Sequence, residues 1–538
     1  MKSITNREEI RNDYPDYLRD ESRVMADAAD ALVFPENEGD VIHALENANR
    51  HDWPVTVSAA RTGIVAGAVP LCGGMILSMS KMSMPREIGY DDGKQEWYLT
   101  VEPGMLLVGI QECLENYFCF YRNILPESSI SLLEHLKGEG RRLFYPPDPT
   151  ETSATIGGTA ATNASGARTF KYGSTREYIR RMRVALTDGT VIDIRRGTTY
   201  AGSDQLIHIP AGGNGNPGRD GYTIPVPTYR MPDTKHCAGY FARPGMDGID
   251  LLIGSEGTLG VITEIEIKLC EIKGERVSIL AFFDSELDAL GYVAEMREGS
   301  RNKVLDVEAL EYFDMNSLEL LRERKRQGES SLPEIPEAGA AIYTEITCTE
   351  GELETAFEIL EQYLACANSS VERAWAGLEA SEIKKMKLFR HSVPETINQI
   401  IAKRQQTLPG LHKIATDLAV PDGALQEIMG YYHEALNMTG MQHAIFGHIG
   451  NNHLHVNMMP NSVQELNQAE RLYADFAQKA VELGGTVAAE HGIGKLKKTF
   501  LEYLYGRAGI EEMAQVKHGF DKTMRLGAGT VFDTSVTK

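Results

Sequence analysis

Several kinds of residue are scarce in this chain, and each shortage excludes a class of protein. The seven cysteines among 538 residues are scattered, without a Cys-x-x-Cys pair, so neither an iron–sulfur cluster nor a disulfide framework is indicated. No stretch reaches the roughly 18 consecutive apolar residues of a membrane span, and the segment after Met1 has no apolar core for export. We therefore expect a cytoplasmic protein, with a peripheral position at the inner face of a membrane as the alternative.

Positive charge is also in short supply. Lys and Arg total 54 against 76 Asp and Glu, a formal net charge of −22, which argues against a surface for nucleic acid or anionic lipid. The apolar content of 42% is ample for buried cores in a chain of this length. Composition thus fits a large globular protein and predicts no nucleic-acid partner.

Histidine, in contrast, is concentrated in one place. The block from 448 to 457 reads His-Ile-Gly-Asn-Asn-His-Leu-His-Val-Asn. Successive side chains of a strand alternate faces, so His453, His455 and Asn457 would project together while Leu454 and Val456 pack behind them. One face of this strand is therefore chemical and the other belongs to the core.

A metal site follows from the residues near that face. His448 precedes the strand in a Gly- and Asn-rich loop from which it could fold back, and Glu490 would add a carboxylate. Imidazoles plus a carboxylate bind first-row divalent ions, zinc above all, with manganese or iron as alternatives. His491 would remain free as an acid or base. The competing interpretation is a hydrogen-bonded structural hairpin; two compact polar clusters set in glycine favour the functional site.

The first half of the chain carries glycine-rich turns of another kind. A strand-like segment, 54–58, leads into the loop 62–70, whose small residues would let backbone N–H groups approach a phosphate. The loop matches neither a dinucleotide-fold fingerprint nor a Walker loop. Between 153 and 168 there is almost no bulky side chain, as expected where backbone packs against itself or against a large flat cofactor. The segment 252–269 reads as a strand, a glycine turn and a second strand.

Taken in this order, the motifs resemble those of FAD-dependent flavoproteins of the vanillyl-alcohol-oxidase and para-cresol-methylhydroxylase superfamily. The resemblance is to the branch that contains D-lactate dehydrogenases, the glycolate oxidase flavin subunit and D-2-hydroxyglutarate dehydrogenase. It implies an α+β fold in which a two-subdomain FAD-binding domain of the para-cresol-methylhydroxylase (PCMH) type spans 1–270. An α+β substrate or cap domain would span 271–538, with a C-terminal segment that returns to the flavin domain.

The resemblance also implies which residues hold FAD, without a covalent link. Histidine and cysteine, which commonly attach flavin in this superfamily, are absent from 58–70 and from 153–173. Residues 61–68 would cradle the pyrophosphate, and later segments would line the rest of the cofactor. The implied residues are Arg61, Thr62, Gly63, Gly67, Ala68, Pro147, Asp148, Thr155, Gly157, Gly158, Asn163, Gly166, Tyr172, Gly173, Glu256, Gly260 and Ile262.

In the second half, the family's two polar motifs fall on the histidine block and on Glu490–Gly494. The resemblance makes His448, His455 and Glu490 the metal ligands, and it makes His491, Asn457 and His453 catalytic residues.

An arginine that binds the substrate carboxylate in the family falls on Arg390. Its guanidinium suits two parallel charge-assisted bonds; the alternative is an arginine on a helix surface. D-2-hydroxyglutarate dehydrogenases carry a lysine near position 415 that could hold a second carboxylate. Here the residue is Ala415, which favours a monocarboxylate, although Lys413 lies close by.

Three departures from the family pattern stand out. Two expected glycines of the pyrophosphate loop are Ala59 and Arg61, so we expect the backbone to avoid positive φ at both. An expected asparagine is His453, which is then either an additional metal ligand or a substrate contact. The stretch 198–232 is longer than usual and reads as an inserted loop, either functional or simply surface.

These observations predict an FAD-dependent dehydrogenase that oxidises an (R)-2-hydroxy acid, D-lactate or a similar monocarboxylate, by hydride transfer to flavin N5 with metal assistance. Its partners would be the small hydroxy acid and an electron acceptor, namely an electron-transferring flavoprotein, a cytochrome or a quinone, and a homodimer is open. Two rivals remain: a non-redox flavoenzyme like alkylglycerone-phosphate synthase, and a metal-dependent hydrolase without flavin.

Overall fold

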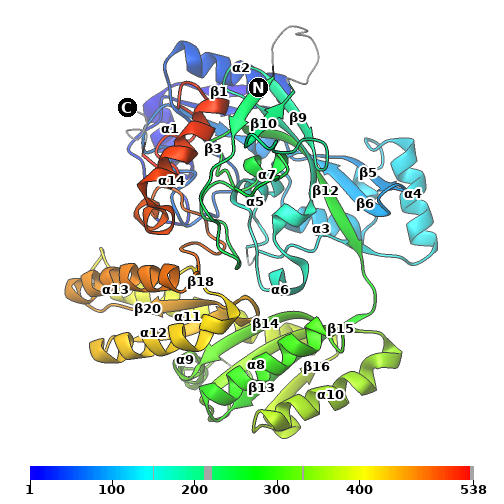
Figure 1. Cartoon of the computed structure of the whole chain (residues 1–538), viewed down its shortest axis with the longest axis vertical. Helices are drawn as coiled ribbons and strands as arrows, with labels where there is room; N and C mark the ends of the chain where they lie inside the picture. Colours follow the sequence, from blue (N-terminus) through cyan, green and yellow to red (C-terminus); the bar gives the residue numbers. More distant parts are fainter. Residues whose placement is uncertain (150, 211–220, 330–331, 534–538) are drawn as a thin grey trace.

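The chain folds into two halves stacked along the long axis of the molecule (Figure 1). The computed structural model describes residues 1–149, 151–210, 221–329 and 332–533. Helices and strands alternate through both halves, which confirms the predicted α+β class.

Two sheets build the upper half. The first has the order β1-β2-β4-β3, and its central pairs are parallel. The second has the order β5-β6-β12-β8-β9, with β7 beside β12, and its pairs are antiparallel. The strands are β1 (Lys2–Ile4), β2 (Ala31–Phe34), β3 (Val55–Ser58), β4 (Met75–Ser78), β5 (Pro85–Asp91), β6 (Glu96–Val101), β7 (Leu143–Phe144), β8 (Ile179–Ala185), β9 (Val191–Arg195) and β12 (Val261–Glu271).

Helices of this half cover the sheets and carry the small-residue segments. They are α1 (Arg7–Asp13), α2 (Glu38–Arg50), α3 (Leu107–Glu115), α4 (Glu127–Gly138), α5 (Ile156–Thr162), α6 (Thr169–Tyr172) and α7 (Ile249–Leu252). Helix α2 shows why they form: the Asn37 side chain caps its first turn, and its buried residues repeat at helical spacing. The strand predicted to begin at 252 is wrong, because Leu252 ends α7. The second strand predicted in this segment is confirmed as β12, which begins at Val261.

A single sheet forms the centre of the lower half. Its order is β16-β13-β15-β14-β19-β20-β17, with β18 also paired to β20. The strands are β13 (Glu275–Phe283), β14 (Asp306–Asp314), β15 (Ala340–Cys348), β16 (Ala374–Gly377), β17 (Ile414–Ala415), β18 (Leu418–Ala419), β19 (His443–His448) and β20 (His453–Met458). The helices are α8 (Glu286–Arg301), α9 (Met315–Arg326), α10 (Leu353–Cys366), α11 (Ala380–Gln405), α12 (Leu425–Thr439) and α13 (Val463–Glu482).

The C-terminal segment returns to the upper half. Helix α14 (Lys498–Phe520) lies beside the first sheet in Figure 1. Beyond it, Val55 of β3 donates its N–H to Arg525 O at 3.0 Å, and Gly527 donates to Val55 O at 2.8 Å. The last segment therefore pairs with the start of β3, the strand that leads into the predicted pyrophosphate loop.

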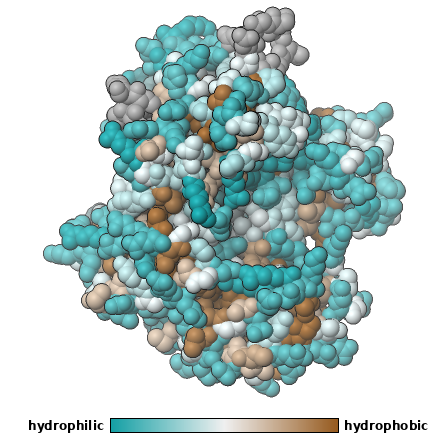
Figure 2. All heavy atoms as spheres, viewed as in Figure 1, coloured by the Kyte–Doolittle hydropathy of each residue, from teal (hydrophilic) through white to brown (hydrophobic). Residues whose placement is uncertain are grey.

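The stretch predicted as an insertion contains a hairpin of β10 (Leu206–Ile209) and β11 (Tyr222–Pro225), whose strands pair antiparallel. Its middle, 211–220, lies outside the described residues. The basic run 322–326 on α9 is only partly solvated: Arg322 is 9% exposed and donates to the carbonyls of Ile335 and Pro336. No helix among the described residues combines the length and the apolar character needed to cross a bilayer. Hydrophilic side chains cover most of the face of the molecule shown in Figure 2.

Candidate active site

A tight hairpin of β19 and β20 presents the histidines. His448 pairs with His453 in the register and Phe446 with His455. The sequence suggested that His448 lies in a loop, but in the structure it is the last residue of β19. The loop between them turns through Asn452, whose φ of 52° is left-handed, and Arg297 fixes it by donating to Ile449 O and to the Asn452 side chain.

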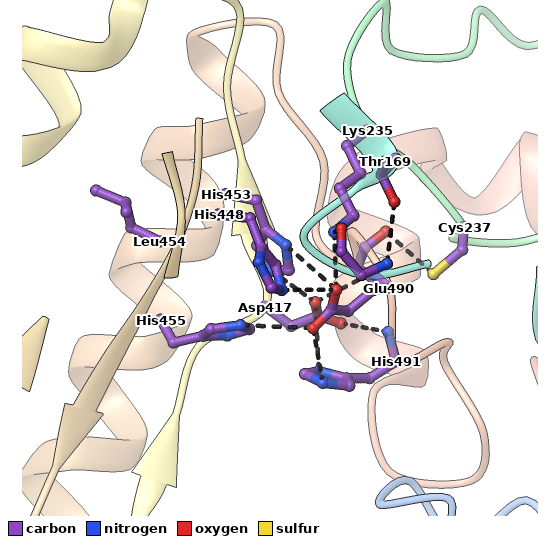
Figure 3. Close-up of polar contacts among 12 residues, drawn as sticks. Thr169, Lys235, Cys237, Asp417, His448, His453, Leu454, His455, Glu490 and His491 are labelled. Carbon is purple, nitrogen blue, oxygen red and sulfur yellow. Dashed lines mark hydrogen bonds and ion pairs between the residues drawn. The ribbon is translucent and has the colours of Figure 1, made fainter. Parts of the chain in front are cut away.

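The predicted ligands converge on one carboxylate (Figure 3). Glu490 Oε2 lies 3.2 Å from His448 Nε2, and Glu490 Oε1 lies 3.5 Å from His455 Nε2. His453 Nδ1 is 3.7 Å from Glu490 Oε2. One ligand atom from each of these four residues lies within 4.8 Å of all the others.

This geometry fits a divalent ion. Tetrahedral ligands at about 2.1 Å from a metal lie about 3.4 Å from each other, close to the spacings found. Both ring nitrogens of His453 are fully buried, and although one is 3.1 Å from Asp417 Oδ1, neither makes a hydrogen bond with acceptable angles among the described residues. Burial holds the pKa of His453 well below its usual value, which keeps the ring in the neutral form that binds metal. The geometry therefore groups His453 with the ligands.

Neighbouring acceptors orient the outer two imidazoles, as around metal-binding histidines generally. His448 Nδ1 meets the carboxylate of Glu311, and His455 Nδ1 meets Thr416 O at 3.0 Å. Each ring therefore turns its Nε2 toward Glu490.

Lys235 joins this cluster without any signal in the local sequence. Its Nζ donates to Glu490 Oε2 at 2.7 Å and to Gly166 O at 3.2 Å, and its side chain is 2% exposed. Burial alone would raise the pKa of Glu490, but Lys235 and the imidazoles outweigh it and hold that pKa well below the usual value. Glu490 is thus an anion in this site.

Asp417 is a second acidic centre that sequence reasoning did not assign. It accepts the backbone N–H groups of Glu490 and His491 at 3.2 and 3.1 Å, and the ammonium of Lys497 at 2.8 Å. It is 1% exposed and follows β17 in an otherwise apolar stretch. An acidic residue within an apolar stretch was the sequence signal that could have identified Asp417.

His491 lies between the two carboxylates. Its Nδ1 is 3.3 Å from Asp417 Oδ1, and its Nε2 is 3.3 Å from Glu490 Oε1. Burial disfavours the charged ring, but Asp417 and Glu490 outweigh it and raise the pKa of His491 to about 9. A role as base therefore requires that the charge of Glu490 be engaged elsewhere, as a bound divalent cation would do.

Arg390 belongs to the same site and is not on a helix surface. It lies on α11 with 17% of its side chain exposed, and its Nε donates to Glu311 Oε2 at 3.0 Å. Its two Nη groups make no hydrogen bond among the described residues. Because Glu311 also holds His448, the guanidinium lies one side chain away from the ligand cluster. Asn457, only 2% exposed, donates to His455 O and stabilises β20.

The predicted cofactor residues come from several segments of the upper half, which are together called the cofactor strip: 61–68, 147–148, 155–166, 172–173 and 256–262. The loop after β3 meets α5, since a Cβ on Gly158 would lie 3.4 Å from Ala59 Cβ. Gly157 and Gly166 have no room for a side chain, because a Cβ would come within 2.5 Å of Pro103 and 1.9 Å of Asp148 O. Gly260 is similarly required, by packing on β8, where a Cβ would lie 2.2 Å from Val184.

The strip offers groups that an anionic, polar cofactor would use. A Cβ on Gly63 or Gly67 would meet nothing within 4 Å, so these backbones face open space. The hydroxyls of Ser58, Ser165 and Thr530 are buried without a hydrogen-bond partner among the described residues. Buried polar groups are normally paired, so these features fit FAD.

One prediction about this strip is wrong. Arg61 has a φ of 62° and does adopt the left-handed region; its guanidinium stacks 4.1 Å from the ring of Tyr17, and Glu21 donates to its carbonyl. Those contacts hold a conformation that costs an ordinary residue about 1–2 kcal/mol. The Glu256 carboxylate accepts the N–H groups of Ile493 and Gly494 at 2.9 and 2.7 Å, and its contact with FAD stays a prediction.

Comparisons with known proteins agree with this layout. A model described as "FAD binding domain" matches residues 29–125 and 127–195. A model described as "FAD linked oxidases, C-terminal domain" matches residues 272–531. The chain belongs to the FAD-linked oxidases. It is therefore an FAD-dependent oxidoreductase, which leaves the flavin-free hydrolase without support.

Relatives of this FAD-linked oxidase cover nearly its whole length. A D-lactate dehydrogenase from Anaerostipes hadrus is 27% identical over 523 residues, 96% of this chain and 92% of the relative. The glycolate oxidase subunit GlcD of Bacillus subtilis is 25% identical over 95% of this chain and 90% of its own. A D-2-hydroxyglutarate dehydrogenase from Stutzerimonas stutzeri is 25% identical over 96% and 94%.

A solved structure of alkyldihydroxyacetonephosphate synthase superposes with a TM-score of 0.57 at 14% identity, covering 94% of this chain and 76% of the synthase. This likeness shows a shared fold and does not favour the synthase reaction.

Proposed function

We propose that this FAD-linked oxidase oxidises an (R)-2-hydroxy acid to the 2-oxo acid with the help of a divalent metal. One observation carries the proposal: the imidazoles of His448, His453 and His455 meet Glu490 on one side while His491 meets the same carboxylate on the other. Relatives named D-lactate dehydrogenase, glycolate oxidase subunit and D-2-hydroxyglutarate dehydrogenase support the substrate class.

Each residue has a distinct task in this proposal. Arg390 would bind the substrate carboxylate through its two Nη groups, while Glu311 fixes the plane of its guanidinium. Nε2 of His491, which faces the ligand cluster, would take the hydroxyl proton, and Asp417 on the Nδ1 side would orient the ring and stabilise its charge. Bound FAD supplies a hydride acceptor and a bound divalent ion a Lewis acid.

Ala415 supports a small substrate. Its Cα pairs with that of Asn457, so the position faces the site without a cation. Lys413 lies two residues before Ala415. Burial lowers the pKa of Lys413 and so disfavours its charged form. We propose D-lactate or a similar monocarboxylate, with His448, His453, His455 and Glu490 as the metal ligands.

Anaerobic flavin reduction tests the proposal directly. The FAD-loaded protein is mixed with matched D- and L-2-hydroxy acids, beginning with lactate, and absorbance at the flavin bands is followed. We expect bleaching with the D-series only. Bleaching by neither series, or equally by both, would contradict the assignment of substrate and stereochemistry.

A further inference from the structure

A deep cleft lies between the two halves, apart from the metal cluster. Its volume is about 1240 Å³. The connection from β12 to β13, at the right of Figure 1, forms one side of the cleft. Residues of α3 and α6, which lie nearer the centre of the molecule, also line it. Of the residues assigned to FAD, only Pro147, Asp148 and Tyr172 line it. The cleft therefore adjoins the cofactor strip at one end and is otherwise separate from it.

Its upper wall is aromatic. Trp97, Phe144, Tyr145 and Tyr172 all line the cleft. Phe144 and Tyr172 pack edge to face with centroids 5.7 Å apart, and the hydroxyl of Tyr145 is buried without a hydrogen-bond partner among the described residues. Such a wall suits a planar ring system that carries hydrogen-bond acceptors.

The remaining walls carry cations without partners. Arg142, Lys273 and Lys387 line the cleft, and no ion pair of theirs is found among the described residues, whereas Arg141, Arg168 and Lys171 are paired with acids. Of the acids that line it, only Glu115 and Glu275 lack an ion pair there. In a chain with a net charge of −22, this local surplus attracts anions.

Lys387 is the deepest of these cations. It lies on α11, one turn before Arg390, with its side chain half-buried. Burial lowers its pKa, and Arg168, Arg276 and Arg390 act in the same direction against Glu345. A half-buried ammonium with cationic neighbours and no ion pair among the described residues is the arrangement that an anionic ligand would satisfy.

We propose that this cleft is the binding site of the electron acceptor, and that the acceptor is a small, planar, anionic quinone. The inference rests on the proposed function for its source of electrons. Two electrons and one proton would leave the reduced flavin, and the quinone would take them with one further proton from solvent to become a hydroquinone. The aromatic side chains would border the quinone ring, and Lys387 would pair with its anionic group.

A binding measurement without hydroxy acid tests the site itself. The oxidised, FAD-loaded protein is titrated with naphthoquinone sulfonate, and quenching of tryptophan fluorescence is followed, with Trp97→Phe identifying the tryptophan that responds. We expect saturable quenching in the native protein and about tenfold weaker binding in Lys387→Met, for the loss of one charge-assisted bond. Lys403→Met, on an exposed part of the same helix, is the matched control and should bind normally. Native-like binding in Lys387→Met, or displacement by D-lactate, would overturn the proposal.

A kinetic measurement separates this proposal from the proposed function. Enzyme reduced anaerobically with dithionite is reoxidised by naphthoquinone sulfonate or by neutral menadione, so no hydroxy acid is involved. We expect Lys387→Met to need about tenfold more naphthoquinone sulfonate for half-maximal rate, with the response to menadione little changed. An equal loss for both quinones, or no loss, would overturn the acceptor site, whereas failure of hydroxy acids to reduce the flavin would overturn only the proposed function.

Discussion

Single residues in this protein take their roles from which neighbours meet them. His448, His453 and His455 differ little in sequence context, yet Glu311 orients the first ring, Thr416 O orients the third, and the His453 ring makes no hydrogen bond among the described residues. His236, outside the cluster, is another case: it bonds Thr486 Oγ1 at 2.7 Å and Tyr505 OH at 2.9 Å and stays neutral. The residues around each histidine thus distinguish the structural His236 from the predicted metal ligands and the proposed base.

The proposed base can be separated from the ligands by substitution. His491→Asn should slow flavin reduction by about 10²–10⁴-fold, the usual contribution of a general base, with metal and FAD contents unchanged. Stopped-flow absorbance and metal analysis measure both. Glu490→Gln is the comparison and should lose metal. Native-rate reduction in His491→Asn would mean that the proton leaves by another route.

His236 should make stability depend on pH. Burial, and then Arg176 and Arg243, lower the pKa of His236 to about 3. The unfolded chain takes up a proton near pH 6.5 and the folded chain does not, so stability present above 6.5 is lost as pH falls toward 3. The free energy of unfolding should fall by about 1.4 kcal/mol per pH unit from this group.

Urea unfolding between pH 6.5 and 5 measures that slope. His236→Gln retains a neutral side chain that can bond Thr486 and Tyr505, and its unfolding free energy should fall less steeply by the stated amount. Parallel slopes for the two proteins would show that His236 is not the titrating group.

At the scale of elements, the loop from Glu490 to Lys495 joins the two halves. Glu256 accepts two of its N–H groups, Lys495 donates to the carbonyls of Ala66 and Gly67, and Gly494 lies against Val65 O, where a Cβ would come within 2.0 Å. The loop that bears the proposed base is therefore held by the flavin half of the chain.

The substitution Glu256→Gln tests how the flavin half holds the loop from Glu490 to Lys495. One amide oxygen replaces two carboxylate oxygens, so one buried N–H loses its acceptor, at a cost of about 1–3 kcal/mol. Thermal unfolding should show the loss, and flavin reduction should slow because His491 is less well placed. Glu139→Gln, at an exposed position, is the control. Unchanged stability and rate would show that water or another group replaces the carboxylate.

The sequence predicted the elements better than the contacts between them. The period-two pattern of 453–457 depends on neighbours along the chain, and the strand it predicts is confirmed as β20. Lys235 reaches the site from a segment far from it in sequence, so no local spacing pointed to it, whereas Asp417 lies between Arg390 and His448 and was marked only by its apolar surroundings. Arg61 shows the same limit, because Tyr17 and Glu21 hold its left-handed backbone from a distance.

At the scale of the whole molecule, the cofactor strip and the ligand cluster are built largely from different halves. Chelation of the divalent ion should therefore abolish turnover while FAD stays bound. Absorbance of the protein after gel filtration reports FAD, and readdition of zinc or manganese should restore activity. Full turnover in metal-free protein would reduce the cluster to a structural role.

The absence of histidine and cysteine from 58–70 and 153–173 leads to a second expectation at this scale. Acid precipitation should release all the yellow colour into the supernatant, because FAD is held only by non-covalent contacts. A washed pellet that remains yellow would show a covalent link.

The return of the C-terminal segment has a consequence for how the protein is made. β3 obtains backbone partners from Arg525 and Gly527, residues that a ribosome adds long after Val55. The start of the strand leading into the predicted pyrophosphate loop thus lacks these partners until almost the whole chain has been synthesised. A premature stop before Arg525 would leave Val55 unpaired on that side even though every predicted cofactor residue is present.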